Sequence, residues 1–370
     1  MTQQLPLKPN ESIVFSLRSL FDSYGYSLYK MSKFEEYDLY SKNKDSLVSD
    51  GVITFTDTNG KLMALKPDVT LSIVKNTSNS KASVQKLYYN ENVYRVSKSS
   101  HTFKEIMQVG LECIGKIDNF CIFEVLTLAL NSLLSITEHS VLDISNLDVL
   151  TQIIDYLEIP NSEKADVIRC IGEKNFHELS SICSQLGVAD EKIRVLKDIV
   201  AIHDSPDIAF PKMNRILKNI VDAETLSKFE KIVLSLGNKD AVKIDFSVVD
   251  DIHYYNGIVF KGFIEGAPNS VLSGGQYDTL MKKMKRKEKA IGFAVYLDML
   301  EQLNRDYVNY DVDTVIVYDD TTSFEDLQSI ACEYRKNGNT LLLCDVPSDL
   351  RFRKILKIEN GEVKQFETNA

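Results

Sequence analysis

The sequence predicts an α+β protein built on an antiparallel sheet that two separate parts of the chain assemble together. Segments in which apolar and polar residues alternate, as is typical of half-covered strands, occur before residue 146 and again after residue 238. The residues between these segments show helical periodicity, and few strand candidates interrupt it. We therefore expect a sheet that is completed across a helical insertion.

The composition is that of a soluble globular protein with a sizeable core. The chain has 370 residues, enough for two or three domains, with 44% hydrophobic and 26% charged residues. Its formal net charge of −10 repels a nucleic-acid backbone. The longest basic run, Met281 to Ala290, contains six Lys or Arg residues and is interpreted as a solvated loop or helix face. No nucleic-acid partner is predicted.

No feature of the sequence indicates secretion, a membrane span or a metal site. The N-terminus lacks a basic start followed by an apolar core, and no window approaches eighteen uninterrupted apolar residues. The cysteines form no CxxC pair and are expected to be reduced, as in a cytoplasmic protein: 113, 121, 170, 183, 332 and 344. The histidines are too scattered for local metal-ligand spacing, and no cofactor is predicted: 101, 139, 177, 203 and 253.

The first region begins with an amphipathic helix. Asn10 is a candidate N-cap, Gly25 lies just past the expected end, and the apolar face comprises Ile13, Val14, Leu17, Leu20 and Phe21. Strand-like runs follow at residues 51–65, with an Asn-Gly turn between the halves, and at 84–96 and 105–115. An apolar helix over 121–136 is expected to lie against the sheet.

The middle region is helical and the strands then return. Helical periodicity covers residues 147–159, 163–174, 176–187, 190–202 and 223–236. Strand candidates follow at 241–264, 270–280 and 289–303, the last of which is expected to end as a helix. A small α/β appendage comes last, with strands at 314–320 and 340–346, a helix at 323–338 and a hairpin around Asn360-Gly361.

These patterns predict three domains. Residues 1–145 and 239–311 form the core, residues 146–238 the helical insertion, and residues 312–370 the C-terminal α/β domain.

The segment ALKPDVT combines a stiff backbone with polar side chains at the mouth of a strand. Pro67 restricts the chain, and Asp68 and Thr70 supply an anion and a hydroxyl. The anion could hold an α-ammonium group. Taken alone, a Lys-Pro-Asp sequence is usually only a turn.

The segment QVGLE places polar residues on an otherwise apolar sheet. Alternation puts Gln108, Gly110 and Glu112 on one face, and the small glycine leaves room above it. This pattern favours a ligand-facing surface over a core.

Two later segments add tyrosines. Alternation sends Tyr254 and Tyr255 to opposite faces, so at most one is expected to line a shared pocket. Gly274 and Gly275 permit a close backbone approach just before Tyr277, or simply a tight bend.

Together, in this order, the segments resemble the catalytic core of histidyl-tRNA synthetase, which has a class II aminoacyl-tRNA synthetase fold. The resemblance covers about residues 12–300. ALKPDVT is similar to the family's Leu-Arg-Pro-Glu-Gly-Thr segment, and YRV with QVGLE to its motif 2. HYYNGIVF is similar to the histidine-specific Tyr-Tyr-Thr-Gly segment, and GGQYD with IGFAVYLDML to motif 3.

The departures from the family fall on the residues that handle ATP. The motif 3 arginine corresponds to Met299, and a thioether makes no charge-assisted contact with phosphate. The arginine of the histidine-specific segment corresponds to Asp250. Further departures are Ser97, the absence of an arginine near Thr102, Gln276, and Ser32 at the motif 1 proline. Of these arginines only Arg95 is kept, so the resemblance implies that aminoacylation is lost and that no residue is catalytic.

The positions that resemble the amino-acid pocket are largely kept. The resemblance implies a histidine-binding set made up of Asp68, Thr70, Arg95, Gln108, Glu112, Tyr255 and Tyr277. In this hypothesis Gln108, Glu112 and Tyr277 read the imidazole, and Asp68 and Thr70 hold the ammonium group.

A synthetase-like chain that keeps the amino-acid pocket but has lost the ATP-handling arginines resembles the regulatory subunits of ATP phosphoribosyltransferase. These form a paralogous family that accompanies the short form of the catalytic subunit. The resemblance implies a hetero-octamer containing a homodimer of this chain. It also implies activation of the first step of histidine biosynthesis and feedback inhibition by histidine. The appendage is shorter than the usual anticodon-binding domain. A truncated histidyl-tRNA synthetase and another amino-acid-sensing binding module remain alternatives.

Overall fold

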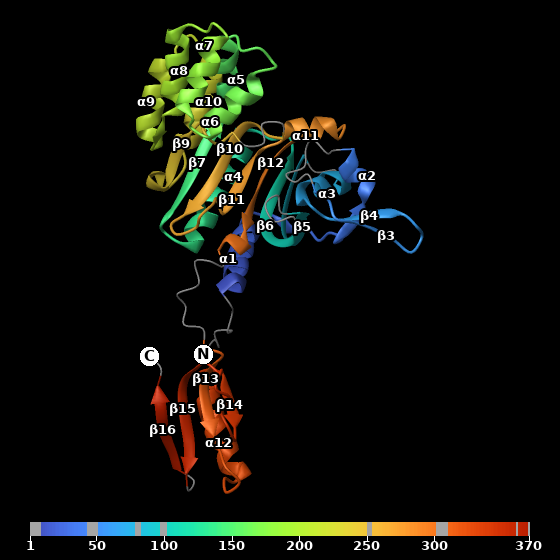
Figure 1. The fold of residues 1–370 in the computed structure, drawn as a ribbon, viewed down its shortest axis with the longest axis vertical. Coiled ribbons are helices and arrows are strands. Elements are labelled where there is room, and N and C mark those ends of the chain that lie inside the picture. Colours follow the sequence, from blue (N-terminus) through green and yellow to red (C-terminus); the bar gives the residue numbers. More distant parts are fainter. Residues whose placement is uncertain are drawn as a thin grey trace. The chain divides into compact units, whose positions relative to one another are not determined.

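The computed structural model describes residues 9–42, 51–77, 83–96, 102–249, 254–300, 310–359 and 362–368. The chain divides into two compact units, residues 1–303 and residues 304–370, and each is described by itself (Figure 1).

The predicted N-terminal helix is confirmed as α1 (Pro9–Ser23), which buries Val14, Leu17 and Phe21. Its candidate N-cap is wrong, because Asn10 lies inside the helix. The predicted Asn-Gly hairpin is also confirmed, as β3 (Thr54–Thr56) paired with β4 (Leu62–Leu65). Gly60 adopts a φ of +80°, which glycine tolerates at no steric cost. With β2 (Phe34–Glu36) these strands form a three-stranded sheet beside α2 (Tyr37–Ser41).

The main sheet has nine strands in the order β1-β5-β6-β12-β11-β10-β7-β9-β8 (Figure 1). In that order the strands are Ser27–Leu28, Val84–Val96, Phe103–Gly115, Lys289–Tyr296, Leu272–Gln276, Asn256–Ile264, Ser140–Asn146, Val242–Asp245 and His203–Asp204. The predicted antiparallel pairing holds for the central strands. Towards the edges, β1 runs parallel to β5 and β7 runs parallel to β9.

Strand β7 was not predicted from the sequence, although it pairs with both β10 and β9. The strand, SVLDISN, is short, and its residues are buried along most of its length. On one face Leu142 and Ile144 enter the core, and on the other Asp143 and Ser145 are also buried. Because both faces are covered, the strand lacks a clean contrast between an apolar and an exposed polar face.

Helix α4 (Asn119–Ile136) is the predicted apolar helix, and Asp118 caps it by accepting a hydrogen bond from the Cys121 amide at 2.9 Å. Among the described residues it is the one helix whose length and hydropathy would suffice for a membrane span. Its side chains belong to the same buried cluster as the sheet, including Val125, Leu126 and Leu133. The helix is therefore placed as a core helix.

The helical insertion contains six described helices. They are α5 (Leu147–Tyr156), α6 (Lys164–Gly172), α7 (Phe176–Gln185), α8 (Asp190–Val200), α9 (Pro206–Ile216) and α10 (Ala223–Leu234). Helix α9 was not predicted, because Pro211 lies inside it; Pro206, in its first turn, is at a position that favours a helix start. The buried residues of the insertion and of the sheet form one continuous apolar cluster.

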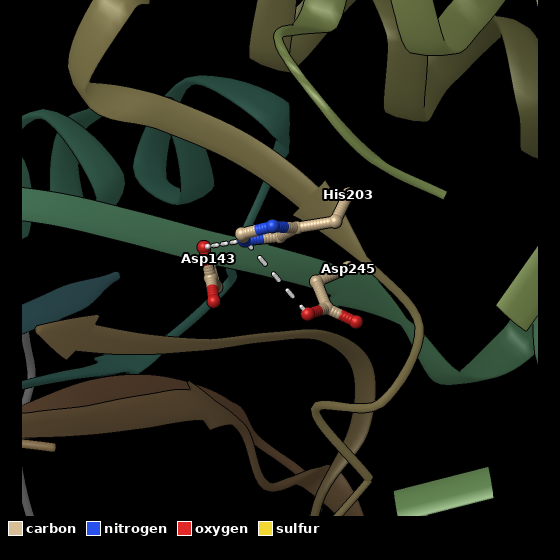
Figure 2. A group of neighbouring side chains, drawn as sticks. All are labelled: Asp143, His203 and Asp245. Carbon is tan, nitrogen blue, oxygen red and sulfur yellow. Dashed lines mark hydrogen bonds and ion pairs between the residues drawn. The ribbon is translucent and has the colours of Figure 1, made fainter. Parts of the chain in front are cut away.

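Polar contacts also join the insertion to the sheet. The ammonium of Lys174, just after α6, lies 2.8 Å from Asp245 on β9. His203 on β8 lies beside Asp143 of β7 (Figure 2).

The C-terminal unit has a four-stranded sheet in the order β14-β13-β15-β16. Its strands are β13 (Val312–Val317), β14 (Thr340–Leu343), β15 (Phe352–Glu359) and β16 (Glu362–Thr368), with α12 (Phe324–Arg335) between β13 and β14. The first three strands in the sheet order are parallel, and β15 with β16 forms the predicted hairpin. The turn residues Asn360 and Gly361 lie outside the described residues. Of the helix expected at the end of the 289–303 segment, Leu297–Met299 form a 3-10 helix and residues 301–303 lie outside the described residues.

Candidate functional site

The residues predicted to bind an amino acid meet in one pocket, called here the Glu112 pocket. Strand β6, the N-terminus of α3 (Val69–Asn76), the chain before β10 and the chain after β11 contribute to it. Its lining contains every predicted residue, namely Asp68, Thr70, Arg95, Gln108, Glu112, Tyr255 and Tyr277. It also contains Val69, Tyr89, Tyr254, Ser273, Gly292, Phe293, Ala294 and Tyr296, which were not predicted as site residues.

Glu112 is held between two hydroxyl groups. Thr70 Oγ1 donates to Glu112 Oε1 at 2.6 Å, and the Tyr277 hydroxyl donates to Oε2 at 2.5 Å. Burial raises the pKa of Glu112 to about 8, although both hydrogen bonds oppose the shift. The carboxyl is therefore fixed in position and titrates close to neutral pH.

Gln108 and Glu112 share the predicted sheet face and are 3% and 2% exposed. Between them, Gly110 lies opposite Tyr89 on β5. A Cβ on Gly110 would meet the Tyr89 phenol. The room above this glycine, expected from the sequence, is thus occupied by the protein's own tyrosine.

Asp68 caps helix α3, since its side chain accepts a hydrogen bond from the Leu71 amide at 2.9 Å. Burial raises the pKa of Asp68, while that amide and the nearby Arg95 oppose the shift. Arg95 itself donates from Nε to the Pro67 carbonyl oxygen at 2.9 Å. The turn expected around Pro67 and the pocket residue Asp68 therefore belong to one local structure, which these hydrogen bonds hold together.

The expectation for the tyrosine pair is wrong, because both Tyr254 and Tyr255 line the pocket. Strand β10 begins only at Asn256, so the alternation of a strand does not apply to the two residues before it. Their rings pack edge to face with centroids 4.7 Å apart, and the Tyr254 ring lies 5.9 Å from that of Tyr277. These aromatic rings leave a cavity volume of about 40 Å³.

The glycine pair lies inside β11 and forms no bend. A Cβ on Gly275 would meet the Tyr255 ring, and one on Gly274 would meet Phe293 and Phe260. The two glycines therefore permit the close approach that the sequence suggested as one possibility.

A second pocket adjoins the first and shares Arg95, Tyr255, Ser273 and Tyr296 with it. It is called here the Met299 pocket, and its cavity volume is about 290 Å³. Met299, a predicted departure from the synthetases, lies in its lining, where Arg95 and Lys261 are the cationic residues among those described.

The other predicted departures fall in several places. Gln276 accepts a hydrogen bond from the Ile258 amide at 2.8 Å and so ties β11 to β10. Ser32 accepts one from the Phe34 amide at 3.3 Å. Asp250 and Ser97 lie outside the described residues.

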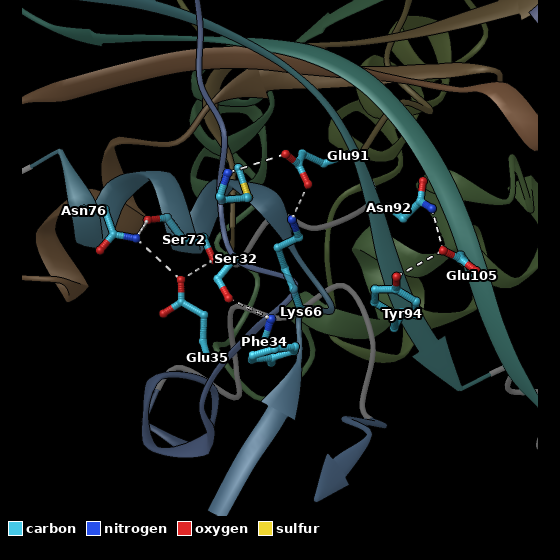
Figure 3. A network of polar contacts seen from close by, with 11 residues as sticks. Ser32, Phe34, Glu35, Lys66, Ser72, Asn76, Glu91, Asn92, Tyr94 and Glu105 are labelled. Atoms are coloured by element: carbon cyan, nitrogen blue, oxygen red, sulfur yellow. Dashed lines mark hydrogen bonds and ion pairs between the residues drawn. The ribbon is translucent and has the colours of Figure 1, made fainter. Parts of the chain in front are cut away.

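A network of buried charges supports the segment that carries Asp68 (Figure 3). Lys66 is 0% exposed, and its ammonium lies 2.9 Å from a carboxylate oxygen of Glu91 on β5. Burial lowers the pKa of Lys66, and Glu91 opposes that shift. Beside it, Glu35 accepts hydrogen bonds from Ser72 and Lys75 of α3. The network thus holds in place both the segment that leads into α3 and the helix itself.

The chain matches the family model described as histidyl-tRNA synthetase over residues 6–300. It is 28% identical to the "ATP phosphoribosyltransferase regulatory subunit" of Clostridium kluyveri over 87% of this chain and 85% of that protein. It is also 26% identical to the "Histidine--tRNA ligase" of Methanocaldococcus jannaschii over 84% of this chain and 75% of that protein. The relatives therefore include both regulatory subunits and ligases.

Solved structures show the same fold. A Bacillus halodurans protein described as an ATP phosphoribosyltransferase regulatory subunit/histidyl-tRNA synthetase has a TM-score of 0.78 and 23% identity, and the match covers 96% of each chain. A chain of the ATP phosphoribosyl transferase (HisG:HisZ) complex from Thermotoga maritima has a TM-score of 0.62 and 20% identity, covering 80% of this chain and 98% of that chain. The predicted class II synthetase-like α+β fold is confirmed.

Proposed function

The chain belongs to the histidyl-tRNA synthetase family, and from this premise we propose that it is a regulatory subunit of ATP phosphoribosyltransferase. In this role it catalyses no reaction itself. It activates a short-form catalytic subunit in the first step of histidine biosynthesis and transmits feedback inhibition by histidine.

The observation that carries the proposal is the contrast between the two adjoining pockets. The Glu112 pocket keeps a full set of polar groups suited to an amino acid, whereas Met299 lines the neighbouring pocket where the synthetases have an arginine for ATP. A thioether offers phosphate no charge-assisted hydrogen bond. The Glu112 pocket is thus suited to recognise an amino acid, whereas the neighbouring pocket lacks the motif 3 arginine that would help to activate it.

Histidine is the proposed effector. Glu112, fixed by Thr70 and Tyr277, is placed to accept a hydrogen bond from an imidazole N–H, and Gln108 lies on the same face. Asp68 supplies negative charge for the ammonium group. The cavity of about 40 Å³ holds only a few water molecules, so histidine has to displace part of the lining. The Tyr254–Tyr255 segment, which precedes β10, is the part proposed to move.

The proposed partner is a short-form ATP phosphoribosyltransferase catalytic subunit, in a hetero-octamer built around homodimers of this chain. The names of the Clostridium kluyveri relative and of the Thermotoga maritima complex support association with a catalytic subunit. Histidine would inhibit by binding one state of the assembly more tightly than another. Such differential binding is the only way in which the effector can shift the assembly.

The test is to titrate this protein into a short-form catalytic subunit from the same organism and to measure phosphoribosyl-ATP formation with and without histidine. We expect activity to rise to a stoichiometric plateau and to fall when histidine is added. No activation at any ratio, with a folded and assembly-competent partner, would refute the regulatory assignment.

A histidine–tRNA ligase is the second candidate, because the Methanocaldococcus jannaschii relative carries that name. This candidate requires histidine-dependent exchange of pyrophosphate into ATP. We expect no such exchange, since the residue at the arginine position of motif 3 is Met299. Exchange at a rate comparable to that of a ligase would reverse the assignment.

A further inference from the structure

Three side chains with metal-ligating atoms meet on one face of the main sheet, although no metal site was predicted from the sequence (Figure 2). His203 on β8 pairs directly with Asp245 on β9. Asp143 on β7 pairs with Lys243, two residues before Asp245. Because residues two apart on a strand share a face, all three side chains point to the same side.

The spacing of the ligand atoms is close to that of a coordination polyhedron. His203 Nε2 lies 3.3 Å from Asp143 Oδ1 and 4.0 Å from Asp245 Oδ2. All the ligand atoms lie within 4.8 Å of one another. Ligands about 2.0–2.1 Å from a tetrahedral Zn²⁺ are separated from one another by about 3.3 Å. The distance between His203 Nε2 and Asp143 Oδ1 already has this length, and the other distances must shorten for an ion to be coordinated.

A buried hydroxyl with no partner lies on the same face of the sheet as the cluster. Ser145 is 0% exposed, and its Oγ has no hydrogen-bond partner among the described residues. It lies two residues after Asp143 on β7, and extending the pairing of Ile144 with Ile244 by one residue places it beside Asp245. A polar atom buried without a partner is costly. An ion, or a water molecule bound to an ion, would satisfy it.

The charge balance also favours a cation. Asp143 and Asp245 are 7% and 4% exposed, and buried carboxylates require compensation. Lys174 supplies one positive charge, 2.8 Å from Asp245, to a cluster that contains two buried carboxyl groups. The Lys174 ammonium occupies one side of Asp245, so it competes with an entering ion. The half-exposed His203 leaves a path from solvent.

We propose that Asp143, His203 and Asp245 form a divalent-cation site for a transition metal such as Zn²⁺, with water or Ser145 completing the coordination. Carboxylate and imidazole are suitable ligands for this ion. The bound ion joins β8, which follows helix α8 of the insertion, to β7 and β9 of the sheet. It thus reinforces the edge of the sheet from which the helical insertion extends. The inference is independent of the proposed regulatory function.

The experiment uses the full chain after treatment with a chelator. Co²⁺ titration is followed by visible absorption, and Zn²⁺ binding by calorimetry. We expect one ion per chain, a rise in melting temperature on Zn²⁺ addition, and a loss of at least about tenfold in affinity in His203→Ala and Asp143→Asn. Lys174→Met is expected to bind Zn²⁺ more tightly than the wild type, because the competing ammonium is gone.

His177→Ala is the matched control, since His177 is an exposed histidine of helix α7 in the same insertion. It should bind the ion as the wild type does. Circular dichroism checks that the variants are folded. If Asp143→Asn is unfolded, the proposal is tested with His203→Ala, since the His203 side chain is half-exposed. Absence of Co²⁺ and Zn²⁺ binding by the wild type, or undiminished binding by a folded His203→Ala variant, would overturn the proposal.

Discussion

Gly292 lies directly opposite Glu112 where β12 pairs with β6, and a Cβ on Gly292 would collide with the Glu112 carboxylate. The glycine on one strand therefore makes room for the buried acid on the next. This pairing determines where the carboxyl sits in the Glu112 pocket.

The first prediction follows from this pairing. Gly292→Ala should displace the Glu112 carboxylate from its hydrogen bonds with Thr70 and Tyr277, and should destabilise the fold by about 1–3 kcal/mol. Urea denaturation measures the loss. Gly237→Ala is the control, because nothing lies within 4 Å of a Cβ built there. Equal stability of the two variants would contradict the role assigned to Gly292.

A second prediction concerns recognition. Glu112→Ala should weaken histidine binding by about tenfold or more, because a buried hydrogen bond to a charged or polar ligand group is lost. Isothermal titration calorimetry is the measurement. Glu105→Ala, on the same strand β6 but outside the pocket lining, should leave the affinity unchanged. If Glu112→Ala binds histidine normally, the effector site lies elsewhere.

The raised pKa of Glu112 predicts how stability changes with pH. Its value in the folded protein is about 8, against 4.5 for an unperturbed glutamate, so the folded state holds an extra proton between these values. Since stability falls with pH wherever the folded state binds more protons, this residue should lower stability as pH rises from about 4.5 to about 8. Denaturation midpoints across this range measure the slope. Glu112→Gln should flatten it, and an identical slope in this variant would show that other groups cause it.

The buried pair of Lys66 and Glu91 gives a prediction about stability. Lys66→Met should cost about 3 kcal/mol, because it leaves Glu91 without its counter-charge in a largely buried position. Lys61→Met is the matched control, since Lys61 pairs with Glu36 where both side chains are half-exposed and solvent screens the ion pair, so its loss should change stability little. Thermal or urea unfolding distinguishes the two. Similar small losses in both variants would mean that the buried pair contributes little.

Local patterns predicted much of this fold. The periodicity of apolar residues located α1, a long apolar run located α4, and the alternation of apolar and polar residues located β5 and β6. Strand β7 escaped prediction because both of its faces are covered. Helix α9 was not predicted, because a helix accepts proline only at certain positions and with suitable packing around it, and a sequence pattern does not show that packing.

The candidate site was predictable where its residues lie in recognisable motifs. Gln108 and Glu112 are examples, since their spacing alone puts them on one face. The inclusion of both Tyr254 and Tyr255 depends on where β10 begins, a boundary that alternation does not fix. The meeting of Asp143 with His203, 60 residues apart, depends on the order of strands in the sheet. No local sequence pattern carries that information.

The parallel pairing of β7 with β9 also limits how this protein could be shortened. Antiparallel neighbours can be joined by a tight turn, but parallel neighbours need a crossover of a dozen or more residues. The helical insertion, from Leu147 to Leu234, is that crossover. Splicing Asn146 to Val242 through a short linker would therefore break the strand pairing at this edge, and it would also remove the helices that share the core with the sheet.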